Sequence, residues 1–103
     1  MAVSQSATIT AANTFTTPIQ IIGWYNVSIS RPSGVVGTLG GTTATVQRSF
    51  DNGVTWLDLK QWIVTAEEYG FEPEGSLIRV GVKTAQYVLS VNVRIGHEGG
   101  MTK

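Results

Sequence analysis

The chain has 103 residues, of which 42% are hydrophobic and only 14% are charged, and its formal net charge is zero. A neutral chain lacks the basic face that neutralises nucleic-acid phosphates or docks on an anionic membrane, so we expect neither partner. The absence of cysteine excludes a disulfide framework and a thiolate metal site. It fits synthesis in a reducing cytoplasm, as does the start of the chain, which lacks the basic and apolar regions of a signal peptide.

Alternating apolar and polar residues predict β-strands in the first third of the chain. Tyr25, Val27 and Ile29 share one face, with polar residues between them. Residues 1–12 are expected to include an extended arm. The strands predicted here lie at residues 7–10, 15–22 and 25–30.

The middle of the chain begins with a glycine-rich segment. Residues 31–43 contain four glycines and one proline, which predicts either a flexible loop or a loosely paired hairpin. The alternation of apolar and polar residues then resumes. It predicts strands at residues 44–50, 54–59 and 59–64.

The last third opens with an acidic run. Residues 67–76 hold four glutamates together with Gly70, Pro73 and Gly75, and this composition predicts an ordered crossover between sheets. A weak helix start at Thr65 is limited to a turn by the glycine and proline that follow. Two further strands are predicted at residues 78–83 and 91–95, followed by a second arm at residues 96–103.

These elements together predict the fold class. Seven to eight short strands, separated by turn residues every 8–12 positions, are typical of an all-β, antiparallel β-sandwich of jelly-roll-like or Ig-like type. The length allows one domain, over residues 1–103.

One motif stands out between two strands. The segment from Ser49 to Trp56 fits Ser/Thr-x-Asp-x-Gly-x-Thr-Trp and resembles the Asp-box of sialidase-type propellers. We expect Asp51 to accept backbone N–H groups, Gly53 to take a positive φ, and Thr55 to flank the turn. Trp56 is expected to pack beneath the turn. Because a propeller needs several such blades and the chain has one copy, we interpret the motif as a self-stabilised hairpin rather than a sugar-handling site.

The charged residues offer no catalytic set. Paired glutamates can hydrolyse glycosides or bind calcium, but the acidic run lacks the ligand spacing of a calcium loop. We expect these glutamates to be solvated or to meet Arg79, Lys83 and Arg94 of a neighbouring subunit. The residues predicted to contact a partner are Glu67, Glu68, Glu72, Glu74, Trp62, Arg79 and Arg94.

His97 and the tryptophans are the remaining candidates. His97 beside Glu98 could form a dyad or half a metal site, but a glycine-flanked tail is a poor scaffold, so we expect a solvated or contact residue. No enzyme activity, cofactor or metal is therefore predicted. Core packing is favoured for the tryptophans, and Trp62 is the one whose ring is most expected to be exposed. An exposed Trp62 or Tyr87 would favour the alternative function, a carbohydrate-binding module for host glycans.

Four segments together resemble small β-sandwich structural proteins of tailed bacteriophages. In such proteins an extended entry strand is followed by a hairpin, an acidic turn and a strand that ends Arg-x-Gly-Val-Lys. Asn52 stands where glycine is commoner, and asparagine tolerates the left-handed conformation. The segments are Phe15–Gln20, Trp24–Ile29, Val46–Trp56 and Tyr69–Lys83.

This resemblance implies a component of the virion. It implies a capsid decoration (cement) protein, a head-fibre base or a connector-associated protein, made in the host cytoplasm and assembled there. Its partners would be copies of itself, as a trimer or dimer, and the major capsid protein or another virion protein. The two terminal arms would become ordered on these partners. A small hydrolase that uses the glutamates is the third hypothesis.

Overall fold

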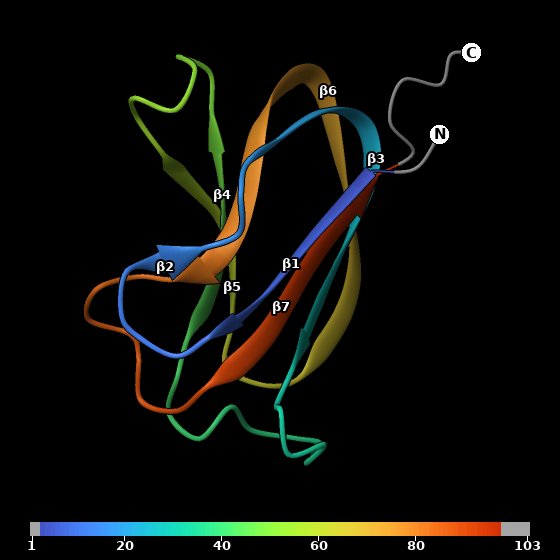
Figure 1. The fold of residues 1–103 in the computed structure, drawn as a ribbon. Coiled ribbons are helices and arrows are strands. Elements are labelled where there is room, and N and C mark those ends of the chain that lie inside the picture. The colour runs from blue at the N-terminus through green and yellow to red at the C-terminus, as the bar shows by residue number, and fades with distance from the viewer. Residues whose placement is uncertain (1–2, 98–103) are drawn as a thin grey trace.

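The computed structural model describes residues 3–97, which form a single antiparallel sheet of seven strands without any helix (Figure 1). The hydrogen-bonded order is β1-β7-β3-β6-β4-β5, and the short β2 pairs with β6 beside this path. The predicted all-β class is confirmed. The strands are β1 (Val3–Ile9), β2 (Thr14–Phe15), β3 (Ile19–Ser30), β4 (Ala44–Ser49), β5 (Leu57–Trp62), β6 (Ala66–Val82) and β7 (Val91–His97).

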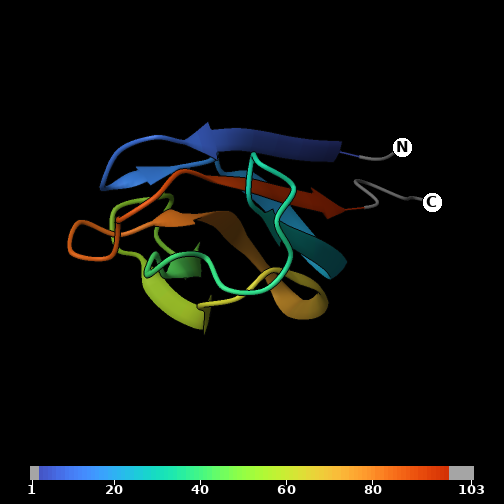
Figure 2. The same ribbon diagram turned by 90° about the horizontal axis from the view of Figure 1, so that it is seen from below.

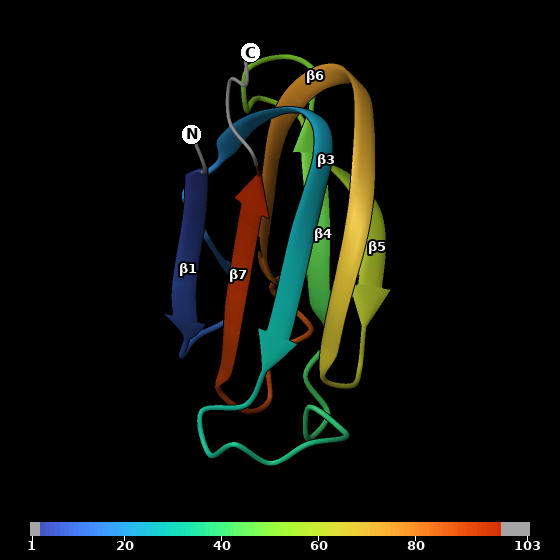
Figure 3. The ribbon, with the colours of Figure 1, turned by 90° about the vertical axis from the view of Figure 1, so that its right-hand side faces the viewer.

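The sheet is folded over itself by its two longest strands, β3 and β6. They pair from Ile29↔Ala66 to Ile19↔Ile78, with a bulge next to Gly23, where φ is +96°. A bulge bends a strand and increases its twist, and glycine accepts the positive φ without a Cβ clash. β7 pairs with the second half of β3, whereas β4 pairs with the second half of β6. The β1–β7 side therefore lies opposite the β4–β5 side (Figures 2 and 3).

The core lies between these two sides. No helix covers the sheet within residues 3–97, so the apolar strand faces are buried against each other. In β7, for example, Val91, Val93 and Ile95 point inward while Arg94 is exposed. The buried apolar residues form one cluster: Ile9, Ile19, Ile21, Tyr25, Val27, Ile29, Leu39, Ala44, Val46, Trp62, Ile78, Val80, Val82, Val91, Val93 and Ile95.

Three sequence-based expectations are corrected by the strand bounds. Most of the expected N-terminal arm is strand β1, which pairs with β7 from Val3↔His97 to Ile9↔Val91. The acidic run 67–76 is not a crossover between sheets, because it lies inside strand β6, and no helical turn starts at Thr65. Of the expected C-terminal arm, residues 96 and 97 belong to β7, and residues 98–103 lie outside the described residues.

The glycine-rich segment 31–43 is an irregular loop held at several points. Leu39 is fully buried, and its amide donates to the Ile63 carbonyl oxygen at 2.9 Å. The Thr42 hydroxyl donates to the Leu89 carbonyl oxygen at 2.9 Å and accepts the Leu89 amide at 2.7 Å. These bonds attach the loop to the β5–β6 connection and to the segment before β7, so a hairpin is not needed to order it.

None of the described residues forms a helix long and apolar enough to cross a bilayer.

Candidate functional site

The Ser49–Trp56 hairpin is built from side-chain bonds to its own backbone. Ser49 Oγ donates to Asp51 Oδ1 at 2.7 Å and accepts the Gly53 amide at 2.8 Å. Asp51 Oδ1 also accepts the Thr55 amide at 2.8 Å. These bonds, first the Thr55 amide and then Ser49, lower the pKa of Asp51 from 3.8 to about 2. Asn52 and Gly53 have φ of +62° and +91°. The geometry supports the expected structural role.

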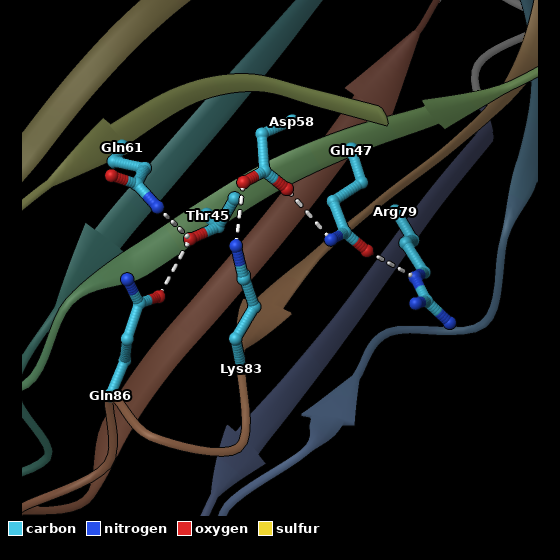
Figure 4. Close-up of polar contacts among 7 residues, drawn as sticks. All are labelled: Thr45, Gln47, Asp58, Gln61, Arg79, Lys83 and Gln86. Atoms are coloured by element: carbon cyan, nitrogen blue, oxygen red, sulfur yellow. Dashed lines mark hydrogen bonds and ion pairs between the residues drawn. The ribbon is translucent and has the colours of Figure 1, made fainter. Parts of the chain in front are cut away.

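A polar network covers the outer face of β4 (Figure 4). Arg79 Nε donates to Gln47 Oε1 at 2.9 Å, Gln47 Nε2 donates to Asp58 Oδ1 at 2.9 Å, and Lys83 donates to Asp58 Oδ2 at 2.6 Å. The Lys83 and Gln47 bonds lower the pKa of Asp58. A second, shorter chain runs through the buried Thr45. We call this set the outer network, and its members are Thr45, Gln47, Asp58, Gln61, Arg79, Lys83 and Gln86.

Arg79 is held in place by two aromatic rings in addition to its hydrogen bond to Gln47. Its guanidinium lies 4.0 Å from the ring centre of Phe15 and 4.1 Å from that of Trp56, so the cation is held between two aromatic faces. Burial there lowers the pKa of Arg79. The hairpin tryptophan thus attaches the turn to β6 through Arg79, which makes Arg79 a packing residue of this chain.

A pocket of about 250 Å³ lies on the opposite, inner side of the sheet. It opens between the first half of β6 and the strands β4 and β5. β5 and β6 follow each other in the chain but do not pair. Side chains cross this gap instead of backbone hydrogen bonds. We call it the inner pocket, and its polar and aromatic lining consists of Tyr25, Arg48, Lys60, Trp62, Glu68, Tyr69, Phe71 and Glu72.

The deepest charge in the inner pocket is Glu72, which is 1% exposed. Arg48 Nη1 donates to Glu72 Oε1 at 2.9 Å, and the Glu74 amide donates to Glu72 Oε2 at 3.2 Å. Burial opposes ionisation of Glu72, but the Arg48 and Glu74 hydrogen bonds outweigh it and hold the pKa of Glu72 below its usual value. The Arg48 side chain is 30% exposed, so it connects the buried carboxylate to the pocket mouth.

A second pair, Lys60 and Glu68, lies nearer to solvent. Lys60 Nζ contacts Glu68 Oε1, and this hydrogen bond is the main cause that lowers the pKa of Glu68. The Trp62 indole N–H favours the same ionised form, but it makes no hydrogen bond of ordinary length. Since Trp62 is 7% exposed, its N–H is a buried donor without a partner in the described part of the chain.

The wall of the inner pocket includes the Tyr25 ring, which lies across the backbone of β6. A Cβ placed on Gly70 would be 2.2 Å from Tyr25 Cζ, so only glycine leaves room for this ring. Burial raises the pKa of Tyr25, and the nearby Glu72 charge adds to that effect. The Tyr25 hydroxyl therefore remains protonated and can donate or accept a hydrogen bond.

An aromatic face lies on the outside of β3 and β6. Trp24 and Phe71 are cross-strand neighbours whose ring centres are 5.0 Å apart in an edge-to-face arrangement. Tyr69 follows on the same face and is 84% exposed, and Ile22 precedes Trp24. We define the aromatic face as Ile22, Trp24, Tyr69 and Phe71. Contiguous apolar surface of this kind is uncommon on a monomer and usually marks an interaction site.

The residues predicted to contact a partner fall into two groups, those that are buried or paired within this chain and those that lie at the surface. The prediction of an exposed Trp62 ring is wrong, because that ring is buried and Trp24 is the exposed one. Glu68 and Glu72 form ion pairs within this chain, which removes the expected need for a neighbouring subunit's cations. Arg79 is occupied by the outer network.

The other predicted contact residues lie at the surface or at a strand end. Glu67 and Glu74 are exposed, and the Ser28 hydroxyl donates to Glu67 Oε1 at 2.8 Å. Arg94 is also exposed and donates to Asn26 Oδ1 at 3.0 Å. His97 is not solvated, because it is buried at the end of β7.

Three residues of the inner pocket, Arg48, Tyr25 and Gly70, were not predicted as site residues from the sequence. Tyr25 was placed correctly on the inward face, but a tyrosine there is usually a core residue. The signal that could have identified the pocket is the spacing of Glu68, Gly70 and Glu72, which puts two acids and a glycine on one face of a strand. Within residues 3–97, no cluster of three metal-ligating side chains occurs.

Comparison with known proteins finds no match among family models, curated proteins or solved structures.

Proposed function

We propose that this chain is a structural subunit of a virus particle of the tailed-phage type, and that it self-associates through its aromatic face. The observation that carries the proposal is the exposure of Trp24, Tyr69 and Phe71 side by side on rigid, paired strands. Aromatic residues are enriched at interface centres because they bury a large area at little entropic cost.

The rim of this face favours a second copy as the occupant. Glu67 and Arg94 flank the aromatic face, and neither is paired with an opposite charge among the described residues. In a two-fold interface every contact occurs twice, because a residue pair that meets across the interface in one direction also meets in the other. Glu67 of one copy can therefore meet Arg94 of the second, twice. The zero net charge removes long-range repulsion between copies.

The placement in a virion is supported by the resemblance of four segments to phage β-sandwich proteins. The oligomer would bind the major capsid protein or a neighbouring virion protein as a decoration subunit. The free edges of β1 and β5 are available for that contact, since an edge strand exposes unpaired N–H and C=O groups.

The proposal is tested by the mass of the protein in solution. Sedimentation velocity over a range of concentrations should show a dimer for the parent chain. The double variant Trp24→Ser/Phe71→Ser should sediment as a monomer, because it removes the centre of the interface.

The matched control is Val54→Ser. Val54 is 82% exposed and lies in the hairpin, away from the aromatic face, so this variant should keep the parent's oligomeric state. A parent chain that stays monomeric at high concentration, or a double variant that sediments like the parent, would overturn the proposal.

A further inference from the structure

We infer that the inner pocket binds a single neutral sugar ring, held by hydrogen bonds to Trp62, Arg48 and the glutamates of β6. The pocket lies mainly on the inner side of β6, but Tyr69 and Phe71 of the aromatic face also line it, whereas Trp24 does not. It also differs from the glycan site expected from the sequence, which needed an exposed ring of Trp62 or Tyr87.

The first support is a pair of donors that the protein leaves unused. The buried Trp62 Nε1 and Arg48 Nε have no hydrogen-bond partner among residues 3–97, and both residues line the inner pocket. Leaving a buried donor unpaired costs about 1–3 kcal/mol, so native proteins keep few of them. Arg48 Nε has no acceptor among these residues, and the Trp62 N–H faces Glu68 without a hydrogen bond of ordinary length, so a ligand hydroxyl can complete the bonding of both.

The charge of the pocket selects a neutral ligand. Arg48 is paired with Glu72 and Lys60 with Glu68, so each cation already has its anion. A charged ligand would have to break one of these pairs. The second oxygen of Glu68 and the Tyr25 hydroxyl remain as acceptors beside the unused donors.

A ligand that satisfies this set must offer donors and acceptors on adjacent atoms, as the hydroxyl groups of a sugar do. It must also present a C–H face, because the rest of the lining includes the exposed apolar side chains of Leu59, Tyr69 and Phe71. The volume of about 250 Å³ is below the range of about 300–1,000 Å³ usual for drug-sized ligands. The pocket therefore fits one sugar ring and not an extended chain.

The binding is tested by NMR with neutral methyl glycosides of glucose, galactose, mannose and N-acetylglucosamine. The Trp62 indole N–H signal should shift in a saturable manner with at least one of them. The indole signals of Trp24 and Trp56 should stay in place. Glucuronic acid and glucosamine serve as charged analogues and should bind at least tenfold more weakly.

Two variants separate recognition from folding. Trp62→Phe keeps an aromatic ring without the N–H, and Glu68→Gln keeps the shape of the side chain but removes the charge that orients Lys60. Each should weaken binding at least tenfold, whereas Trp24→Phe should bind like the parent. The dispersion of the amide spectrum checks that each variant is folded. If Trp62→Phe is unfolded, the binding of Glu68→Gln alone tests the inference.

The inference is overturned if no neutral glycoside shifts the Trp62 signal, if the charged analogues bind equally well, or if both pocket variants bind like the parent. Because Tyr69 and Phe71 belong to both surfaces, the titration is made at a concentration at which the parent chain sediments as a monomer. The sedimentation experiment and the NMR titration can therefore fail separately.

Discussion

The outer network and the inner pocket use the same residue types on opposite sides of β4, but they differ in how completely these residues are bonded. In the outer network each side chain drawn in Figure 4 has a partner within 3.3 Å, and Arg79 is also held between two rings. In the inner pocket Arg48 and Trp62 each keep a buried donor without a partner in the described chain. The first arrangement stabilises the fold, and the second leaves bonding capacity for another molecule.

The largest effect is expected from Arg48→Ala, which tests how much stability the pocket itself supplies. Removing Arg48 leaves the buried Glu72 carboxylate without its cation, and breaking a buried pair costs about 3 kcal/mol. Urea unfolding at pH 7 measures this loss. Because the folded-state pKa of Glu72 lies below its usual value, the contribution is present above about pH 4.5 and is lost at lower pH. The difference in the free energy of unfolding between Arg48→Ala and the parent should therefore become smaller in acid. A difference that stays constant with pH would contradict this explanation.

The next effect, about 2 kcal/mol, is expected from Gly70→Ala. The added Cβ would overlap the Tyr25 ring, which must then move into the inner pocket or distort β6. Thermal or urea unfolding measures the cost. The double variant Gly70→Ala/Tyr25→Leu should recover most of the loss relative to Tyr25→Leu alone. If the cost were the same in both backgrounds, the ring would not be the cause.

A smaller difference in the free energy of unfolding is expected between two variants that each remove one buried hydroxyl, Thr45→Val and Ser76→Ala. Thr45 Oγ1 donates to Gln86 at 3.1 Å, so Thr45→Val should cost about 1 kcal/mol. Ser76 Oγ is buried and lies near enough to Glu72 to help lower the pKa of that carboxyl, but it makes no hydrogen bond of ordinary length among residues 3–97, so Ser76→Ala should change the free energy of unfolding by less than about 0.5 kcal/mol. Equal losses in urea unfolding would show that the two hydroxyls are equally well bonded.

The smallest effect concerns the hairpin and is seen through pH. With its pKa lowered from 3.8 to about 2, Asp51 stabilises the fold above pH 3.8, and this contribution is lost as the pH falls through about 2. Asp51→Asn should remove this part of the acid dependence of the melting temperature. The carboxyl carbon of Asp51 should titrate near pH 2 by NMR, and a midpoint near 3.8 would show that the hairpin bonds are not formed.

The period of two in the sequence was sufficient to predict the fold class and most strands, because that period is a local property of each strand. It failed in the first half of β6, where the inward positions hold Glu68, Gly70 and Glu72. These residues face the inner pocket instead of the apolar core, so the segment resembled an acidic turn. Because the pocket-lining residues interrupt the alternation of apolar and polar positions, this half of β6 was not predicted as a strand.

The assignment of the tryptophans failed for two different reasons. Since Tyr25 was placed inward, alternation already required Trp24 to point outward, and this signal was available in the sequence. Trp62 could not be placed in the same way. The pairing of β4 with β5 shifts by a bulge between Val46 and Gln47, and such a shift changes which face a later residue occupies.

The pairing of β1 with β7 has a consequence for protein engineering. Val3 lies opposite His97, so the two ends of the described chain are neighbours at one end of the sheet (Figure 1). A short linker between them would close the backbone into a ring, and new ends could be opened in an exposed loop. The same proximity would let this domain be inserted into a surface loop of another protein without separating the two sides of that loop.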